Sequence, residues 1–394
     1  MFIDVTHDRR RAESAGRRKY EALVALTAAA LLAGCGGGGS VPGSTRCSTS
    51  VTQNVTGTTL ETILDGAVAA QMKALGLPGA SVALGKRGVT LISKGYGYAS
   101  LTTCQPAQSA TEFQIGSVTK QFTAAAILQL QSAGALNIDD PVRAHLPAYS
   151  FDPRITLRML LNQTSGLPDY TAFSDASSWT TGVSEQTVLT QISSASVLFT
   201  PGSAYSYSNS NYFALGAVVE AVTGVSYPDY LADQIYTSAG LAHTQYTQPS
   251  QSAAPYSTGS TPATIAAPSF EFAAGALWSN ADDLTTWDGA LYDSKVVTSA
   301  SFSLMVTPPD VPAFQQSGRS NYGMGWARGM AVGHDFAWHD GMTSGYAAFN
   351  GLFLDDGFSI SILANNAVSG SGMEAFAVAI LHDVCTNPAT SASC

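Results

Sequence analysis

Hydrophobic residues recur along the chain with two different periods, and these periods divide it into three parts. From residue 58 to residue 75 they return every three or four positions, which predicts an amphipathic helix that ends at Gly76. Two short runs with strand character follow at 80–84 and 89–93, and the turn residues 85–88 between them predict a hairpin. The first part is therefore a helix followed by two strands.

The middle part, from residue 117 to about residue 275, has a mainly helical pattern. A mostly buried helix is expected to begin near Ser117, where alanines and larger apolar residues recur at helical spacing. Long loops rich in Ser, Thr, Pro and Gly separate it from the later helices. These are predicted at 157–162, 185–194, 212–222 and 228–239.

Strand patterns return in the third part, after Trp278. Strands are predicted at 322–326, 336–339, 347–353 and 359–363, and a closing helix at 374–384. Strands at both ends with helices between them indicate an α+β fold, in which one sheet is built from both chain ends and carries a large helical insertion. A cleft between the sheet and the insertion is the expected place for a binding site.

The composition is that of a globular protein. Of the 394 residues, 45% are hydrophobic and only 12% are charged, which is enough for one large domain or two ordinary ones with a substantial core. The sequence contains no internal repeat. No apolar run is long enough to cross a bilayer.

The first 35 residues have the features of an export signal. Basic residues gather between positions 9 and 19, and a short apolar run covers 23–32. Leu32-Ala33-Gly34-Cys35 then resembles the bacterial lipobox, whose cysteine is lipidated and becomes the new N-terminus. The alternative is an ordinary cleaved signal with an incidental cysteine. Residues 36–57, which begin with four glycines, predict a flexible tether.

We therefore expect an exported lipoprotein that faces the periplasm or the cell exterior and touches the membrane only through its N-terminal lipid. The leader holds six of the 18 basic and four of the 28 acidic residues, so its removal changes the net charge from −10 to −12. A chain this acidic has no basic surface for nucleic acid.

Four cysteines remain besides Cys35, an even number in a chain that is expected to be exported. Two disulfides are predicted, with three possible pairings. We favour Cys47–Cys104 and Cys385–Cys394, because each would close a terminal region; free buried thiols are the alternative. The spacing of the histidines and cysteines suggests no metal site, and no cofactor is predicted.

One candidate for catalysis is the pair Ser117 and Lys120, three residues apart on the predicted helix. Residues at this spacing share a helix face. A serine hydroxyl becomes a useful nucleophile when a neighbour takes its proton, and a desolvated lysine can do so because burial lowers its pKa. The alternative is a helix-capping serine beside a surface lysine.

Two later segments carry further candidates. Tyr207 and Asn209 lie in a loop that leads into a helix, and His339-Asp340-Gly341 lies on a late strand. Taken singly, such tyrosines usually pack with a hydrogen-bonded hydroxyl, and a lone strand histidine is usually structural.

Together and in this order, Ser117-x-x-Lys120, Tyr207-x-Asn209 and His339-x-Gly341 resemble the motifs of the penicillin-recognising serine hydrolases. This group includes class C beta-lactamases, D-alanyl-D-alanine carboxypeptidases, family VIII esterases and D-amino-acid amidases. The connecting segments 136–141, 155–168 and 273–277 match as well. The resemblance implies a catalytic domain at 58–385 with a beta-lactamase-like fold, a helical subdomain at about 117–275 and a C-terminal tail at 386–394.

The resemblance also implies a role for each motif residue. Ser117 would be the acyl-accepting nucleophile, and Lys120 would take its proton or hold it through Tyr207, so the identity of the base stays open. Tyr207, with a pKa depressed by the lysine, would activate the deacylating water. Asn209 would orient Lys120 and the acyl chain of the substrate.

The third motif would complete the site. His339 stands where many beta-lactamases have lysine, and it would hydrogen-bond Tyr207. Gly341 would let the strand approach the substrate. The backbone N–H groups of Ser117 and Met342 would form the oxyanion hole.

Asp340 departs from the pattern, since related enzymes often have Thr or Ser there to bind a substrate carboxylate. If its side chain lines the cleft, esters or amides without a carboxylate would be preferred; strand alternation could instead turn it away. A serine acyl hydrolase for esters or amides is therefore expected. The alternatives are a beta-lactamase or D-alanyl-D-alanine carboxypeptidase, and a non-catalytic binder of cell-wall fragments. No G-x-S-x-G elbow is present, which argues against an α/β-hydrolase.

Overall fold

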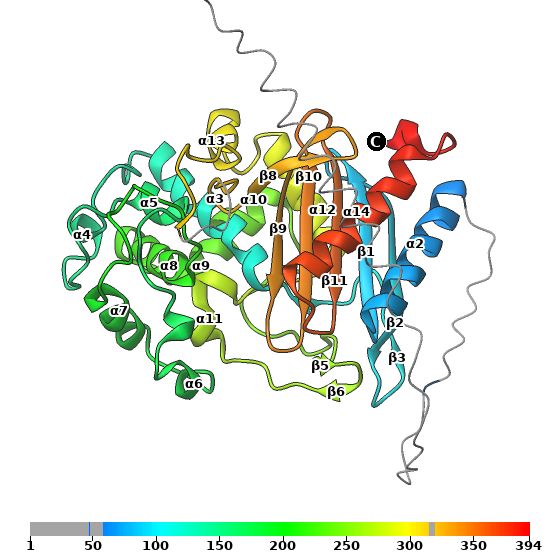
Figure 1. Ribbon diagram of the computed structural model, residues 1–394, viewed down its shortest axis with the longest axis horizontal. Coiled ribbons are helices and arrows are strands. Elements are labelled where there is room, and N and C mark those ends of the chain that lie inside the picture. The colour runs from blue at the N-terminus through cyan, green and yellow to red at the C-terminus, as the bar shows by residue number, and fades with distance from the viewer. Residues whose placement is uncertain (1–46, 48–57, 315–319) are drawn as a thin grey trace, which may run out of the picture. The chain divides into compact units, whose positions relative to one another are not determined.

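Strands from the two ends of the chain meet in a single sheet. This computed structural model describes Cys47 and residues 58–314 and 320–394, so the predicted leader, Cys35 and most of the tether lie outside the described residues. Strand β1 (Gly79–Lys86) pairs on one side with β2 (Val89–Ser100) and on the other with β11 (Phe358–Ala364), antiparallel in both cases. The predicted α+β fold with a sheet built from both chain ends is confirmed (Figure 1).

The main sheet has seven strands in the order β3-β2-β1-β11-β10-β9-β8. The remaining strands of this sheet are β3 (Gln105–Pro106), β8 (Ala327–Ala331), β9 (His334–Met342) and β10 (Ala347–Phe353). Two small pairs, β4 (Phe113–Gln114) with β7 (Trp278–Ser279) and β5 (Tyr256–Thr258) with β6 (Thr261–Pro262), lie outside it.

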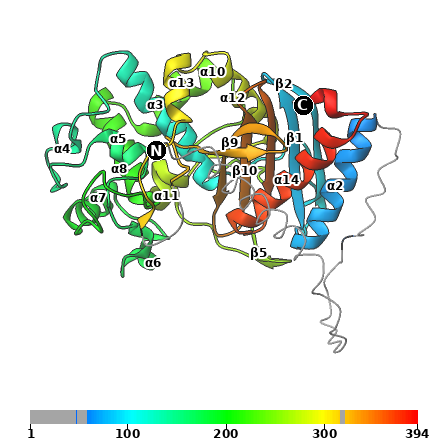
Figure 2. The ribbon, with the colours of Figure 1, turned by 45° about the horizontal axis from the view of Figure 1, so that its top comes forward.

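Helices cover both faces of the sheet. Helices α2 (Thr59–Leu75) and α14 (Gly370–Thr386) lie side by side on one face (Figures 1 and 2), where a hydrophobic cluster packs under them. Helix α12 (Ala281–Tyr292) packs against β1, β2 and β11 on the other face. Both faces of β11 are therefore buried, including its two serines, Ser359 and Ser361.

The helical part lies beside the sheet and is centred on α3 (Thr119–Ser132) and α8 (Asn209–Thr223). The other helices are α4 (Val142–His145), α5 (Leu157–Leu161), α6 (Ala176–Trp179), α7 (Glu185–Ser194), α9 (Tyr227–Tyr230), α10 (Thr237–Ala239), α11 (Pro268–Gly275) and α13 (Ser299–Met305). Helix α3 is buried nearly all round, because α8 and α11 pack against it and Asn350 of β10 hydrogen-bonds its Gln121. None of the helices in the described ranges has the length and apolarity needed to cross a bilayer.

The predicted strand at 322–326 is wrong. Tyr322 makes only an isolated bridge to Ala327, and the strand itself, β8, begins at Ala327. Gly325 has φ +82°, and a Cβ at this position would lie 2.7 Å from the carbonyl oxygen of Lys120. The segment is therefore a turn that packs tightly on α3. Helices α11, α12 and α13 were not predicted.

Other boundaries differ by a few residues. Helix α3 begins at Thr119 and ends at Ser132, and α8 begins at Asn209 rather than at Tyr212. The strand at 347–353 and the helix at 185–194 have the predicted bounds. The two favoured disulfides, Cys47–Cys104 and Cys385–Cys394, are both present, each with a Cα–Cα distance of 5.5 Å.

Candidate active site

Ser117 lies in a tight turn between β4 and helix α3. The turn, a single 3₁₀ turn over Gly116–Val118, continues directly into α3. Gly116 has φ +51°, and a Cβ on it would lie 2.8 Å from the backbone nitrogen of Met342 at the end of β9. Glycine is therefore required here for two reasons, its left-handed backbone and the close approach of β9.

Three side chains from three elements meet at this turn. Lys120 Nζ lies 2.9 Å from Ser117 Oγ, and the Tyr207 hydroxyl lies 2.8 Å from the same oxygen. Tyr207 comes from the loop before α8, which the fold brings against the start of α3. The structure thus brings together the alcohol, the amine and the phenol that the sequence motifs single out.

Lys120 is completely buried, and its amine has two further partners. Nζ lies 2.8 Å from Asn209 Oδ1 and 2.7 Å from the carbonyl oxygen of Ala274, and both of these can only accept a hydrogen bond. A neutral amine has two hydrogens and one lone pair. It can therefore donate to these two oxygens and accept the proton of Ser117. Desolvation lowers the pKa of Lys120 to about 7, which makes the neutral form accessible.

Tyr207 differs from the sequence-based expectation. Desolvation is the largest influence on its hydroxyl and raises its pKa well above the ordinary value of 10, although the hydrogen bond with Ser117 opposes this. The expected depressed pKa is therefore wrong. A buried phenol stays protonated because its charged form would lose hydration that the site does not replace. Tyr207 can then donate its hydrogen to Ser117 Oγ.

Asp169 fixes the orientation of Asn209. Asp169 Oδ2 accepts hydrogen bonds from Asn209 Nδ2 at 2.9 Å and from the Asn209 backbone N–H at 3.2 Å. The Asn209 amide oxygen is thereby directed at Lys120. The sequence reasoning missed Asp169, although it directly follows Pro168, the last residue of a segment that matches the penicillin-recognising enzymes.

His339 does not hydrogen-bond Tyr207 as expected. Its Nε2 lies 3.0 Å from the hydroxyl of Tyr322, and its Nδ1 lies 2.5 Å from the carbonyl oxygen of Asp340. Because that carbonyl can only accept, Nδ1 carries the hydrogen and Nε2 accepts one from Tyr322. Burial lowers the pKa of His339 to about 4, so the ring is neutral. Tyr322, from the segment wrongly predicted as a strand, was also missed.

The end of β9 lies against the Ser117 turn. A Cβ at Gly341 would lie 2.0 Å from the carbonyl oxygen of Ile115, so any larger residue would push β9 away. The N–H of Thr343 donates a hydrogen bond to the carbonyl of Tyr346 across the β9–β10 turn, at 3.0 Å. Hydrogen-bonded and non-hydrogen-bonded pairs alternate along antiparallel strands, so the next pair, Met342 and Ala347, is a non-hydrogen-bonded one. The N–H of Met342 therefore points away from β10. Strand β8 pairs with β9 only as far as Trp338, which leaves this N–H available near Ser117.

Asp340 points to the opposite face of the sheet. Side chains alternate along β9, and Gly341 faces the Ser117 turn. The Asp340 carboxylate instead lies against Gly370 at the start of α14, where a Cβ would be 2.1 Å from its Oδ2. The predicted repulsion of substrate carboxylates by Asp340 is therefore unsupported.

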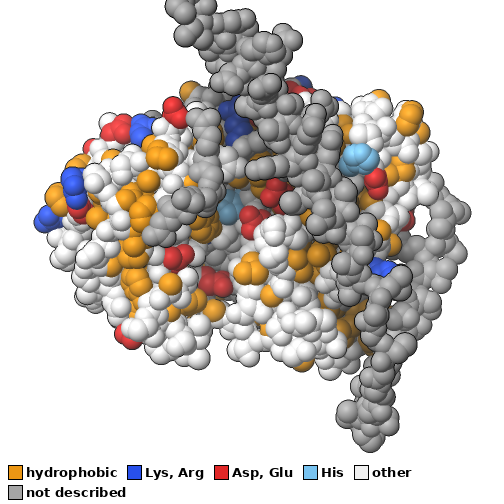
Figure 3. Space-filling model, viewed as in Figure 1, with side chains coloured by type: hydrophobic (Ala, Val, Ile, Leu, Met, Phe, Trp, Pro, Cys, Tyr) orange, Lys and Arg blue, Asp and Glu red, His pale blue; other side chains and the backbone are white. Residues whose placement is uncertain are grey.

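The site lies where the helical part meets the sheet. On the face in Figure 3, acidic side chains gather near the middle of the molecule, along this boundary. In the described ranges, no group of three or more His, Cys, Asp or Glu side chains is placed to hold a metal ion.

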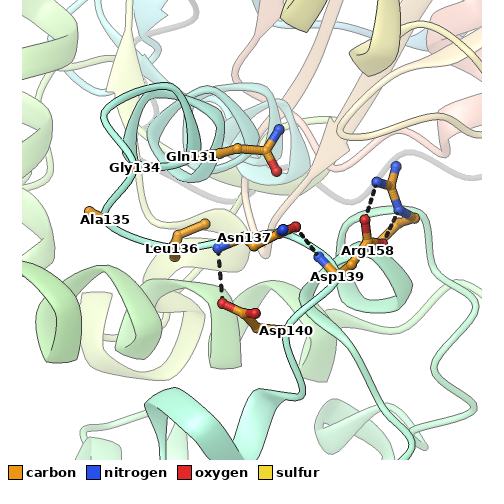
Figure 4. Close-up of a pocket in the computed structure, with 8 residues that line it drawn as sticks. All are labelled: Gln131, Gly134, Ala135, Leu136, Asn137, Asp139, Asp140 and Arg158. Atoms are coloured by element: carbon orange, nitrogen blue, oxygen red, sulfur yellow. Dashed lines mark hydrogen bonds and ion pairs between the residues drawn. The ribbon is translucent and has the colours of Figure 1, made fainter.

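A separate pocket of about 720 Å³ lies beyond the C-terminal end of α3 (Figure 4). The Asp139–Arg158 ion pair and backbone around Gly134 line it. It contains none of the motif residues, so we assign it no part in the reaction.

A sequence model of the beta-lactamase family, described as "Beta-lactamase", matches residues 64–383. The chain therefore belongs to the beta-lactamase family.

Two curated relatives illustrate how far the similarity extends. Protein flp of Staphylococcus aureus is 34% identical over 181 residues, which is 44% of this chain and 35% of flp. The chain thus matches only about a third of the length of that relative. The "Putative penicillin-binding protein PbpX" of Bacillus subtilis is 29% identical over 304 residues, which is 75% of this chain and 72% of PbpX.

Solved structures with the same fold include enzymes that act on amides. A D-stereospecific amidohydrolase from Streptomyces sp. is 26% identical, with a TM-score of 0.69 over 83% of this chain and 99% of that one. The D-amino acid amidase of Ochrobactrum anthropi SV3 is 23% identical, with a TM-score of 0.71 over 82% of this chain and 98% of that one. The second likeness shows the fold alone.

Proposed function

We propose that this protein hydrolyses esters or amides through a covalent acyl-enzyme on Ser117, with Lys120 as the general base. The observation that carries the proposal is the position of Ser117 Oγ, 2.9 Å from Lys120 Nζ and 2.8 Å from the Tyr207 hydroxyl. Both distances suit proton transfer without rearrangement of the site.

The proton inventory favours Lys120 over Tyr207 as the base. The pKa of Lys120 is lowered to about 7, whereas the pKa of Tyr207 is raised well above 10. At neutral pH, about half of the lysine is ready to accept a proton, and the phenol is not. Tyr207 instead donates to Ser117 Oγ and is placed to hand a proton to the leaving group.

Acylation then proceeds in balanced steps. Ser117 gives its proton to Lys120 as Oγ bonds to the substrate carbonyl carbon, and the N–H groups of Ser117 and Met342 hold the resulting oxyanion. When the tetrahedral intermediate collapses, the bond to the leaving group breaks. The leaving group takes a proton from Tyr207, and Lys120 replaces that proton through the hydrogen-bonded network around Ser117.

Deacylation repeats these steps with water as the nucleophile. Water bonds to the acyl carbon and loses a proton to Lys120, and Ser117 leaves with a proton as the acid is released. Lys120 returns to its neutral form, and no redox partner or cofactor is needed.

Amide or ester substrates are supported by the amidohydrolase of Streptomyces sp., which is 26% identical over nearly its whole length. The similarity to flp and to PbpX keeps cell-wall peptides and beta-lactams as the second candidate class. The intact set of Ser117, Lys120 and Tyr207 argues against a non-catalytic binder.

The test is acylation of Ser117. Purified protein is incubated with a p-nitrophenyl ester, a D-amino-acid p-nitroanilide, a D-Ala-D-Ala peptide and a cephalosporin, and intact-mass analysis follows the acyl adduct. We expect turnover of at least the ester, with an adduct that maps to Ser117 and disappears in Ser117→Ala. Turnover that survives in Ser117→Ala would refute the mechanism, and the order of rates decides between the substrate classes.

We also propose that the protein is exported and anchored through a lipid on Cys35. The two disulfides support export, because such bonds persist mainly in oxidising compartments. Metabolic labelling with a palmitate analogue, compared between wild type and Cys35→Ala, tests the anchor. Equal labelling of both would exclude it.

A further inference from the structure

Glu271 is a carboxyl at the catalytic site that the mechanism above does not use. It lies in the first turn of α11, one residue before Phe272, whose φ of 41° and ψ of −134° interrupt the helix. A phenylalanine with positive φ is strained, at a cost of about 1–3 kcal/mol, and such strain concentrates at functional sites.

The interruption ties this segment to the catalytic helix. Beyond the kink, the carbonyl of Ala273 accepts a hydrogen bond from Thr123 Oγ1 at 2.8 Å, and the carbonyl of Ala274 accepts one from Lys120 Nζ at 2.7 Å. Glu271 is therefore held at a fixed place relative to Lys120, and its position is not that of a loose surface side chain.

The carboxyl of Glu271 lies beside the turn that carries Ser117. Gln114, three residues before the nucleophile and only 2% exposed, donates a hydrogen bond from Nε2 to Glu271 Oε2. A Cβ placed on Gly275 would lie 3.8 Å both from this Oε2 and from the carbonyl carbon of Gly116. Glu271 itself keeps part of its surface exposed to solvent.

Glu271 differs from the other acids whose charges act on Lys120, which are Asp169 and Asp340. Asp169 accepts from Asn209 on one oxygen and from Thr171 on the other, so its oxygens are occupied. Asp340 faces the opposite side of the sheet.

Within the described ranges, the Glu271 carboxyl has a single hydrogen-bond partner, Gln114, and makes no ion pair. Burial raises the pKa of Glu271 to about 8, and the positive charge of Lys120 offsets this rise only in part. A second cation, brought in by the substrate, would favour the charged form further, and the carboxyl would ionise as the substrate binds.

We propose that Glu271 is a specificity-determining residue that receives an ammonium group of the substrate, so that acyl groups with an amine next to the scissile carbonyl are favoured. This inference rests on the proposed acyl-transfer function of Ser117. It goes further by naming the substrate class: amides or esters of amino acids with a free amino group.

The experiment compares two substrates that differ only in the amine: phenylalanine p-nitroanilide, as each enantiomer, and 3-phenylpropanoic acid p-nitroanilide. We expect the wild type to have a higher kcat/KM for one enantiomer of phenylalanine p-nitroanilide than for 3-phenylpropanoic acid p-nitroanilide. In Glu271→Gln the ratio of the two kcat/KM values should fall by about 10–100-fold, the loss expected when one partner of a close charge pair is removed.

The ratio of the two kcat/KM values separates the effect of Glu271 on substrate binding from its effect on the base, Lys120. Removing the charge of Glu271 also lowers the pKa of Lys120, but that change affects both substrates equally. Glu112→Gln is the matched control, since Glu112 is held 3.7 Å from His243 and is not among the charges acting on Lys120. Its ratio should equal that of the wild type.

A second measurement needs neither turnover of an anilide nor a folded variant. Phenylalanine amide should slow the acylation of wild-type Ser117 by a p-nitrophenyl ester, and 3-phenylpropanamide should slow it at least tenfold less well. Equal competition, or an unchanged ratio in Glu271→Gln, overturns the role of Glu271 while leaving the acyl-enzyme intact. If no ester acylates Ser117, the proposed function itself is overturned.

Discussion

Asp169 Oδ2 and Asn209 Nδ2 lie 2.9 Å apart, and this bond determines which way the Asn209 amide faces. Its oxygen, 2.8 Å from Lys120 Nζ, is one of the two obligate acceptors that fix the amine. The acid thus acts on the base in two ways, by orienting its hydrogen-bond partner and by its negative charge, which raises the pKa of Lys120.

The first prediction concerns pH. Lys120 acts as a base only when neutral, and its pKa is about 7, so kcat/KM should fall as the pH drops below about 7. In Asp169→Asn the amide oxygen can still accept from Asn209, but the charge is lost. Because that charge raises the pKa of Lys120, the acid limb of the pH profile should move to lower pH.

Asp152→Asn is the control for this measurement, since Asp152 pairs with Arg154 on the surface. Its acid limb should coincide with that of the wild type. An acid limb in Asp169→Asn that stays in place or moves to higher pH would contradict the assignment of Lys120 as the group that titrates.

The second prediction concerns Tyr322, which positions His339. Tyr322→Phe removes the donor to His339 Nε2, so this buried ring nitrogen loses the hydrogen bond that it accepts at 3.0 Å. An unsatisfied buried acceptor costs about 1–3 kcal/mol, so the thermal midpoint should fall. Because His339 lies on the strand that ends at Met342, we also expect kcat to fall by about tenfold, with KM less affected.

A merely structural role would lower the thermal midpoint and leave kcat unchanged at temperatures where the variant is folded. Tyr246→Phe is a suitable control, since this hydroxyl donates to the carbonyl of Pro268 and does not contact His339.

The third prediction concerns Gly116. In Gly116→Ala the new Cβ would lie 2.8 Å from Met342 N, so β9 or the Ser117 turn must shift. Removal of one oxyanion donor typically costs about 10²–10³ in kcat, and acylation of Ser117 should slow by that order. Stopped-flow release of p-nitrophenol measures it directly.

Gly224→Ala separates the two effects of the added methyl group. Gly224 has φ +73° but no atom within 4 Å of the Cβ position. The Gly224→Ala variant should therefore lose stability through backbone strain and keep the wild-type acylation rate. If both variants acylate normally, Met342 has no part in the oxyanion hole.

Much of the fold could be predicted because it depends on local pattern. The mostly apolar run in 347–353 and the helical period in 185–194 give the observed bounds of β10 and α7. The turn at 322–326 could not be predicted. Its two glycines interrupt an otherwise strand-like pattern, and the backbone of Gly325 packs against α3 at Lys120, 205 residues earlier.

In the site, too, local features could be predicted from the sequence and features set by distant contacts could not. The spacing of Ser117 and Lys120 predicts that they share a helix face, and their Oγ and Nζ atoms lie 2.9 Å apart. The protonation of Tyr207 was predicted wrongly because a sequence shows its charged neighbours but not how far its hydroxyl is desolvated. The direction of Asp340 depends on the register between β9 and β10, which only the structure provides.

The last prediction concerns stability and a pair of acids in the helical part. Burial, together with the charge of Glu220, raises the pKa of Glu185 from 4.5 to about 8. The folded state therefore holds a proton that the unfolded chain releases above about pH 4.5. The free energy of unfolding must then fall as the pH rises from about 4.5 to about 8, because unfolding releases this proton and a higher pH favours its release.

Glu185→Gln removes this dependence, since its neutral amide resembles the protonated acid. Relative to the wild type, the variant should gain stability between pH 5 and pH 8.5, and urea denaturation at the two values measures the difference. Asp282→Asn, also a first-turn acid but on α12, should show no such gain. A Glu185→Gln variant whose stability changes equally at both pH values would mean that the folded state does not raise the pKa of Glu185.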